Sequence, residues 1–171
     1  MTLPRLVAVV PLVFNGQGCV GDFAWMIEQP TYGRALFVFN DNEEQFLAFL
    51  RGEPAGLRRG GGNAVIRPFR TTVPPRAAGV PTGCAGRGYD GLSPAVLRVL
   101  DRALDHVREL LATDNYDTLY FSRSTSGRTL GTGVFEVAPE VCQYVYDELC
   151  GLGDADHAQY GLYIENAYGD E

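Results

Sequence analysis

Three consecutive glycines followed by asparagine, at residues 60–63, are the first feature of this sequence that could do chemistry. Consecutive glycines let the backbone approach a ligand closely and turn N–H groups toward it. Arg67 and Arg70 follow shortly after, and forked guanidinium groups suit phosphate oxygens. Because Asn63 and the apolar residues after it are typical of an anchored segment, we favour a phosphate site over the alternative, a flexible surface loop with solvated arginines.

Two further glycine-containing stretches carry polar groups. Residues 79–91 include Thr82 and Gly83, and they also contain a literal G-x-G-x-x-G that begins at Gly86. No predicted strand directly precedes that match, so we do not interpret it as a dinucleotide-binding motif; a tight loop near a phosphate or ribose remains open. Residues 122–133 follow a predicted strand and combine hydroxyls, two arginines and three glycines, which suits a phosphate or diphosphate. The alternative for this stretch is a polar hairpin.

The polar triplet Asn40-Asp41-Asn42 ends another predicted strand. Asp41 with Glu44 three residues later is typical of a variant capping box, which would make the triplet a helix start. Asparagine side chains at a strand end are equally suited to adenine or ribose edges. Both interpretations stay open.

Charge is distributed unevenly along the chain. All fourteen basic residues are arginine, and residues 51–87 contain seven of them against the single acid Glu53, a local charge of +6 in a chain of net charge −7. A general nucleic-acid binder needs a broad positive face, so nucleic acid is not an expected partner. A basic island in an acidic protein indicates a pocket for one small anion-bearing ligand. The predicted ligand-binding residues are Asn40, Asp41, Asn42, Gly61, Gly62, Asn63, Arg67, Arg70, Arg76, Thr82, Gly83, Ser122, Arg128, Gly131, Thr132 and Gly133.

Groups suited to catalysis are sparse. His106 lies at the border of a predicted helix stripe and His157 in the acidic tail, so no Ser-His-Asp or Cys-His pairing follows from their positions. Cys84 sits in a glycine loop near arginines, which could lower its pKa. Asp41 and Asp90 are the remaining candidates for a base. The four cysteines show no C-x-x-C spacing, so we predict no metal site, no disulfide framework and no cofactor, and we assign no catalytic residue.

Strand and helix patterns alternate along the chain. We expect strands at residues 3–14, 35–39 and 118–122, and helices at 43–51, 94–111 and 139–149. Residues 53–91 lose this periodicity, and their prolines argue against longer regular elements. The order predicts a single α/β domain over residues 1–152, with a mixed sheet flanked by helices in a Rossmann-like three-layer architecture. Residues 153–171 form an acidic tail that could add an edge strand.

Two general rules place the protein and its ligand. Ligands in open α/β sheets bind beyond the carboxyl ends of strands, which is where residues 40–42 and 122–133 fall. The first strand is broken by prolines and has no cleavage site, and no apolar run approaches the roughly 20 residues of a membrane span. We therefore expect a cytoplasmic protein that does not bind membranes.

Four stretches carry a resemblance to known proteins: Phe-Val-Phe-Asn-Asp-Asn-Glu at residues 37–43, Gly-Gly-Asn-Ala-Val-Ile-Arg at 61–67, Gly-Val-Pro-Thr-Gly at 79–83 and Leu-Gly-Thr-Gly at 130–133. Over residues 35–150 they resemble a family of uncharacterised bacteriophage-encoded proteins. The arrangement also loosely resembles macro domains, which bind ADP-ribose through an Asp, an Asn and glycine loops, although Asn63-Ala64 is only a fragment of the macro N-A-A-N core. The resemblance implies a macro-like fold and, in a phage setting, an anti-defence role in the host cytoplasm.

The expected function is binding and sequestration of a phosphate-bearing, nucleotide-derived small molecule, such as an ADP-ribose-like or cyclic-nucleotide immune signal. The lack of a convincing acid/base pair favours such a sponge over an enzyme. The first alternative is a hydrolase acting on ADP-ribose or a related nucleotide, with Asp41 or Asp90 as base. The second is an acidic interaction protein that targets a host protein, for which the arginine island would be dispensable. A homo-oligomer is compatible with each of these functions.

Overall fold

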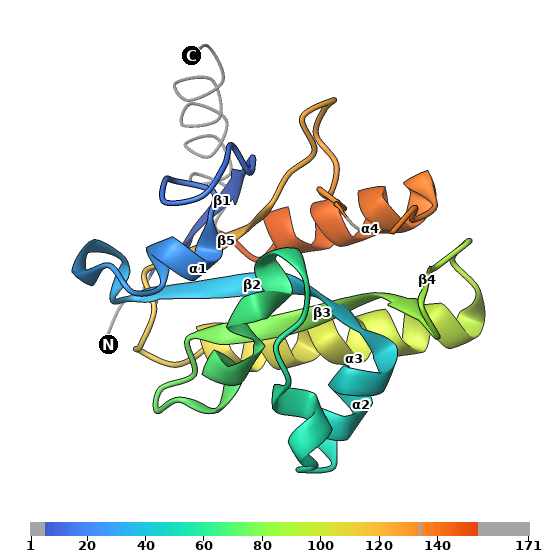
Figure 1. The fold of residues 1–171 in the computed structure, drawn as a ribbon, viewed down its shortest axis with the longest axis horizontal. Helices are drawn as coiled ribbons and strands as arrows, with labels where there is room; N and C mark the ends of the chain where they lie inside the picture. The colour runs from blue at the N-terminus through green and yellow to red at the C-terminus, as the bar shows by residue number, and fades with distance from the viewer. Residues whose placement is uncertain (1–5, 134, 154–171) are drawn as a thin grey trace.

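Five strands form the sheet on which the rest of the chain is built (Figure 1). The computed structural model describes residues 6–133 and 135–153. The strands are β1 (Ala8–Leu12), β2 (Ala35–Asn42), β3 (Ala77–Cys84), β4 (Arg87–Gly88) and β5 (Thr118–Ser122). The helices are α1 (Phe23–Met26), α2 (Glu43–Leu50), α3 (Pro94–Leu111) and α4 (Pro139–Cys150), with 3₁₀ segments η1 (Pro30–Tyr32), η2 (Pro54–Leu57) and η3 (Gly62–Thr71).

The order of the strands in the sheet is β1-β5-β2-β3-β4. β1, β5, β2 and β3 run parallel to one another, and only the short β4 is antiparallel, joined to β3 by a hairpin. Because these four strands are parallel, their carboxyl ends lie along one edge of the sheet. Polar residues that end these strands are therefore brought together although they are far apart in sequence.

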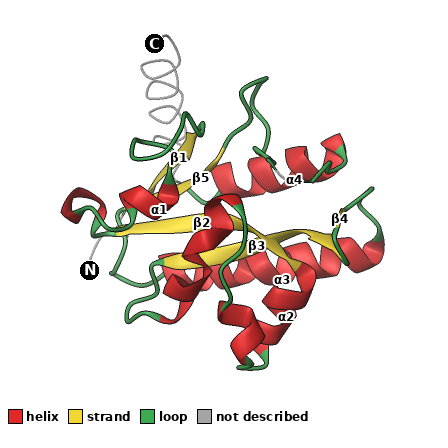
Figure 2. Cartoon of the chain, viewed as in Figure 1, coloured by secondary structure: helices red, strands yellow, loops and turns green. Residues whose placement is uncertain are grey.

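Helices cover both faces of this sheet, so the predicted single α/β domain with a mixed, helix-flanked sheet in three layers is confirmed (Figure 2). On one face α3 and α4 bury side chains such as Leu100, Val107 and Val145. On the other face α1 and η3 bury Phe23 and Ile66 against β2. No described helix is long and apolar enough to cross a membrane.

The predicted start of α3 at Ser93 is confirmed. Ser93 Oγ accepts a hydrogen bond of 3.2 Å from the Val96 amide, and Pro94 is the first helical residue, as N-cap and N1 preferences require. The predicted strand at 118–122 and the helix near 139–149 are also present. Residues 3–5 of the predicted first strand and the tail beyond residue 153, with its predicted edge strand and His157, lie outside the described residues.

The prediction that prolines exclude longer elements from residues 53–91 is wrong at two places. β3 carries Pro81 in its interior, and η3 continues through Pro68. β3 is made mostly of small residues with little strand propensity of their own. It forms because β2 pairs along its edge and because α2, α3 and η3 pack against it. Tertiary contacts here override local preference. β2 is also longer than predicted and includes residues 40–42.

Candidate functional site

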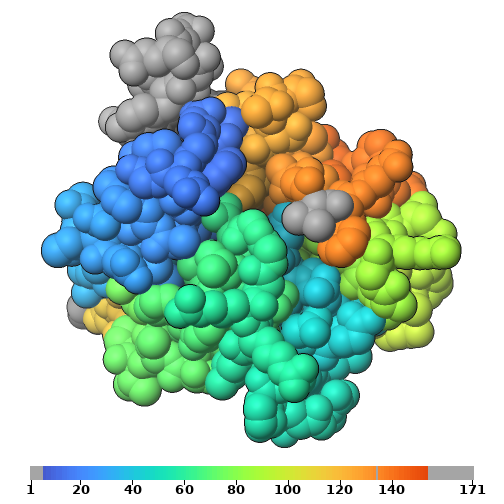
Figure 3. Space-filling model, in the orientation of Figure 1, coloured from blue at the N-terminus to red at the C-terminus, as the bar shows by residue number. Residues whose placement is uncertain are grey.

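A cavity of about 590 Å³ lies at the carboxyl ends of the parallel strands. It is bounded by the residues that follow β1, by the ends of β2, β3 and β5, by the start of η3, and by the segment between β5 and α4. Figure 3 views the face on which these segments meet. The described lining residues are Val13, Phe14, Asn40, Asp41, Asn42, Gly60, Gly61, Gly62, Asn63, Ala64, Arg67, Thr82, Ser122, Arg123, Ser124, Thr125, Gly131, Thr132, Gly133, Phe135 and Val137.

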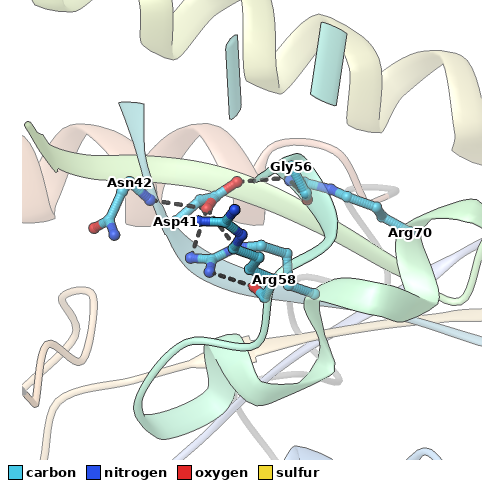
Figure 4. A network of polar contacts seen from close by, with 6 residues as sticks. Asp41, Asn42, Gly56, Arg58 and Arg70 are labelled. Carbon is cyan, nitrogen blue, oxygen red and sulfur yellow. Dashed lines mark hydrogen bonds and ion pairs between the residues drawn. The ribbon is translucent and has the colours of Figure 1, made fainter. Parts of the chain in front are cut away.

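At one side of the cavity Asp41 holds two buried arginines. Its Oδ1 accepts a hydrogen bond from Arg67 Nε and forms an ion pair with Arg67 Nη2, each at 2.9 Å, and its Oδ2 accepts from Arg70 Nη2 at 2.7 Å. The amide of Asn42 adds a third hydrogen bond, at 2.8 Å, to Oδ1 (Figure 4). The three side chains are at most 4% exposed. Asp41, at the end of β2, is therefore the carboxylate that pairs with both arginines. The capping-box interpretation is wrong because α2 starts at Glu43 with no side-chain cap.

The two arginines also cross-link the chain through backbone carbonyls. Arg67 Nη1 donates to the Arg58 carbonyl at 2.7 Å, and Arg70 Nη1 donates to the Gly56 carbonyl at 2.9 Å (Figure 4). The Arg70 guanidinium lies 4.3 Å from the centre of the Phe49 ring, a distance at which a cation and an aromatic face attract. Burial lowers the pKa of Arg70, while Asp41 opposes that shift, and an arginine remains charged throughout the physiological range.

The cluster carries a surplus positive charge. One carboxylate faces two guanidiniums, so Asp41, Arg67 and Arg70 sum to +1 in a buried setting, where an uncompensated charge is costly. Asp41 and Arg67 both line the cavity, whereas Arg70 does not. A guanidinium has five N–H donors, and the bonds of Arg67 to Asp41 and Arg58 use three of them. Within the described chain two donors of Arg67 have no acceptor.

Two glycines leave room for this cluster. A Cβ at Gly60 would lie 3.0 Å from Arg67 Nη1 and 3.2 Å from Nη2, so the missing side chain keeps the outer part of that guanidinium open. A Cβ at Gly79 in β3 would overlap both Asp41 Oδ2 and Arg70 Nη2. Glycine at these positions is thus required by the close approach of charged side chains.

Asn63 anchors the glycine loop from the inside. Its Oδ1 accepts from the Phe23 amide at 3.1 Å, and its Nδ2 donates to Ser122 Oγ at 2.9 Å, which ties the loop to α1 and to the end of β5. The amides of Gly61 and Gly62 have no acceptor among the described residues. The predicted flexible-loop alternative therefore does not describe this segment, which is fixed by side-chain hydrogen bonds while two of its N–H groups stay open.

The opposite wall is held by Asn40. Its Nδ2 donates to the Gly131 carbonyl at 2.7 Å, which joins the end of β2 to the loop that follows β5. A Cβ at Gly131 would lie 2.7 Å from the Arg123 carbonyl, so the loop closes on itself only with glycine there. Ser122 and Thr132 place hydroxyls in the lining beside these contacts. Asn40 and Asn63 thus use side-chain amide groups that could otherwise bind a ligand to hold the walls of the cavity together.

The predicted ligand residues divide into two groups. Those that the fold brings together around the cavity are Asn40, Asp41, Asn42, Gly61, Gly62, Asn63, Arg67, Thr82, Ser122, Gly131, Thr132 and Gly133. Those that do not line it are Arg70, Arg76, Gly83 and Arg128. Arg76 instead donates to the carbonyls of Tyr32, at 2.7 Å, and Ala35, at 3.3 Å. Gly83 pairs with Gly88 in the β3–β4 hairpin.

Sequence reasoning missed a second part of the lining. Val13 and Phe14 follow β1, and Phe135 and Val137 precede α4, so the cavity has an apolar portion beside its polar one. Arg123, which directly follows β5, was also not among the predicted ligand-binding residues. The rule that places sites beyond the carboxyl ends of strands would have found Val13 and Phe14 had it been applied to the first strand. No local pattern marks Phe135.

The candidates for catalysis lie elsewhere or are engaged. Cys84, Asp90 and His106 do not line the cavity. The pKa of Cys84 is raised to about 12, by hydrogen bonding to Glu43, burial and the charge of its acidic neighbours, so the expectation of a lowered pKa is wrong. Asp41 is the one carboxylate among the described lining residues, and three hydrogen bonds and a further ion-pair contact hold it. Within the described residues no three His, Cys, Asp or Glu side chains are grouped to hold a metal ion.

Comparison of the chain with models of known protein families, with curated proteins and with solved structures finds no match. The geometry of the cavity therefore carries the functional argument by itself.

Proposed function

We propose that this protein binds and sequesters a phosphate-bearing, nucleotide-derived small molecule in the cavity at the carboxyl ends of the strands. The observation that carries the proposal is the surplus charge of the buried Asp41–Arg67–Arg70 cluster, two members of which, Asp41 and Arg67, line the cavity. A positive charge inside a low-dielectric wall attracts an anion more strongly than an exposed arginine does. An anionic ligand would also compensate the charge that Asp41 leaves unmatched.

Further features of the lining support a phosphate in particular. Arg67 lies with Gly61 and Gly62 in the cavity lining, and guanidinium groups and the backbone amides of a glycine turn suit phosphate oxygens. Hydroxyls from Ser122 and Thr132 add neutral donors. The cavity volume of about 590 Å³ falls in the range of small-molecule sites, which run from roughly 300 to 1,000 Å³.

Binding is favoured over turnover by the state of Asp41. A general base needs a lone pair aimed at the proton it removes, and both oxygens of Asp41 already accept hydrogen bonds from buried donors. A hydrolase acting in this cavity would have to take its base from another group. The proposed action is therefore capture of the ligand, which leaves it chemically unchanged.

A thermal-shift panel of nucleotides, followed by calorimetry on each positive compound, tests the proposal. The panel contains ADP-ribose, NAD, AMP and cyclic nucleotides, with inorganic phosphate as a minimal probe. A ligand present at 100 times its Kd stabilises the folded protein by roughly 2.7 kcal/mol. Heat release of the bound compound and its analysis by mass spectrometry should return it intact. A panel in which no phosphate compound shifts the melting temperature would refute the proposal, and recovery of a cleaved compound would favour the hydrolase.

Arg67 provides the matched variants. Arg67→Met should weaken binding at least tenfold, while Arg98→Met, which removes an exposed arginine on α3, should leave the affinity unchanged. Because Arg67→Met also disturbs the buried cluster, Gly60→Ala is the second variant. Its Cβ would lie 2.9 Å from Ala64 Cβ and would press on Nη1 and Nη2 of Arg67 without removing charge. Folded protein with unaltered affinity in both variants would place the ligand elsewhere.

A further inference from the structure

The exposed phenylalanines of the described chain share one location. Phe14 is 52% exposed and Phe135 39% exposed, and both line the cavity. The large apolar side chains exposed elsewhere in the described chain are Leu6, Leu47, Leu50 and Val73. No other described phenylalanine is exposed, and those of β2 are at most 1% exposed. Two unburied aromatic rings at a cavity are therefore a local feature and not a property of the whole surface.

These rings come from two separate segments that the fold brings to the same cavity. Phe14 lies two residues beyond Leu12, which is paired with Ser122 of the neighbouring strand β5. Phe135 lies two residues before Val137, whose buried side chain belongs to the core beneath α4. Val13 and Val137 extend the apolar lining beside the two rings. Each ring is thus carried on a segment anchored by a buried neighbour or by strand pairing.

The apolar lining complements the polar lining in chemistry. Phenylalanine offers a flat apolar face and no hydrogen-bond group, so it can hold a planar ring by stacking but offers a phosphate no donor. Resting on the function proposed above, we propose that Phe14 and Phe135 form a stacking site for the nucleobase of the ligand, while Arg67 and the glycine loop take its phosphate. The ligand class is then a nucleotide with its base intact, and a sugar phosphate alone would leave the two phenylalanines without a stacking partner.

Stacking of this kind discriminates weakly between bases. Every nucleobase has a π-face, so a site built from phenylalanine tolerates different bases and prefers those with the larger ring system. We expect AMP and GMP to bind with similar affinity and more tightly than UMP. The same comparison with ribose 5-phosphate isolates the contribution of the base.

The experiment measures the affinity of three ligands, ADP-ribose, AMP and ribose 5-phosphate. The proteins compared are the full chain, Phe14→Ala, Phe135→Ala and the matched control Leu50→Ala. Leu50 is an exposed apolar residue outside the cavity. Each phenylalanine variant should weaken ADP-ribose and AMP about 5- to 150-fold and leave ribose 5-phosphate unchanged. The control should change none of the three. Phe14→Trp provides an independent readout, because a stacked base should quench its fluorescence on addition of AMP but not of ribose 5-phosphate.

The possible failures are distinguishable. Suppose that ADP-ribose and AMP bind, that Arg67→Met abolishes this binding, and that neither phenylalanine variant alters it. The stacking site is then refuted, while the phosphate site stands. If no phosphate compound of the panel binds the unaltered protein, the proposed function itself fails, and the stacking site fails with it.

Discussion

Replacement of Gly79 by alanine should destabilise the protein strongly. Gly79 is a buried residue in β3, opposite Phe39 of β2. An added Cβ would lie 2.5 Å from Arg70 Nη2 and 2.9 Å from Asp41 Cβ, and it would overlap Asp41 Oδ2 as well. Those two charged groups are joined by a bond of 2.7 Å in a region that is at most 1% exposed. The methyl group can be accommodated only if the ion pair separates or the strands move apart.

The loss of stability in Gly79→Ala can be estimated from the cost of separating Asp41 from Arg70. Breaking a buried ion pair so that a charge is left without its partner costs about 3–5 kcal/mol. With a dependence of roughly 2 kcal/mol per molar urea, the midpoint of unfolding should fall by about 1.5–2.5 M. The direction is informative as well, because a Gly→Ala change without strain stabilises a protein by about 0.4–1 kcal/mol through the unfolded chain.

The assay is equilibrium urea unfolding of the unaltered protein, Gly79→Ala and the control Gly127→Ala. Gly127 has no atom within 4 Å of an added Cβ and no positive φ, so alanine there should be neutral or slightly stabilising. A Gly79→Ala midpoint equal to that of the control would refute the reasoning. It would mean that Asp41 and Arg70 are not held as tightly as their distance and burial imply.

Three further predictions concern individual side chains. Arg70→Lys should lower the free energy of unfolding by about 2 kcal/mol, because one ammonium cannot serve both the Asp41 carboxylate and the Gly56 carbonyl; an unchanged urea midpoint would contradict this. Cys84 is exposed, yet its pKa of about 12 should make its alkylation by iodoacetamide at pH 8 roughly a thousandfold slower than that of an ordinary thiol. Glu43→Gln should accelerate this alkylation, and peptide mass spectrometry measures both rates. Fast alkylation of the unaltered protein would contradict the raised pKa. Burial lowers the pKa of His106 below its ordinary value of about 6.5, so the unfolded chain takes up a proton below that pH that the folded chain does not, and stability should fall as the pH drops from 7.5 to 5.5. His106→Gln should reduce that pH dependence in urea unfolding, and an identical slope in the variant would show that the histidine is not responsible.

The parts of the fold that follow from sequence are those set by local signals. The Ser93-Pro94 start and the apolar stripe of α3 are one example, and the strand that ends at Ser122 is another. The cavity edge follows from them, because polar residues that end parallel strands must lie on the same edge of the sheet. Residues as distant as Asn40 and Gly131 could for that reason be assigned to one site before their contact was known.

The parts that could not be predicted depend on partners far along the chain. β3 is composed mostly of residues that do not favour strands, and it depends on its pairing with β2 and on the close packing of Gly79 against Asp41 and Arg70. The role of Asp41 is likewise set by arginines 26 and 29 residues away, whereas its local neighbour Glu44 suggested a cap that is absent. The apolar lining escaped notice because Phe135 resembles any isolated aromatic residue in a loop. Each of these three features depends on residues that are far apart in the sequence, and no local spacing pattern indicated it.

The arginine-rich segment acquires a different meaning once its contacts are known. Arg67 and Arg70 each join Asp41 to a backbone carbonyl, and Arg76 joins two carbonyls of the segment that leads into β2. These bonds need several nitrogen atoms in a fixed plane, which a lysine does not have, so at these positions arginine is required by geometry. The charge that acts on a ligand is then far smaller than the +6 of residues 51–87. What remains at the cavity is the single surplus charge of the Asp41 cluster together with Arg123 in the lining, a balance suited to one phosphate or diphosphate and too small for a polyanion.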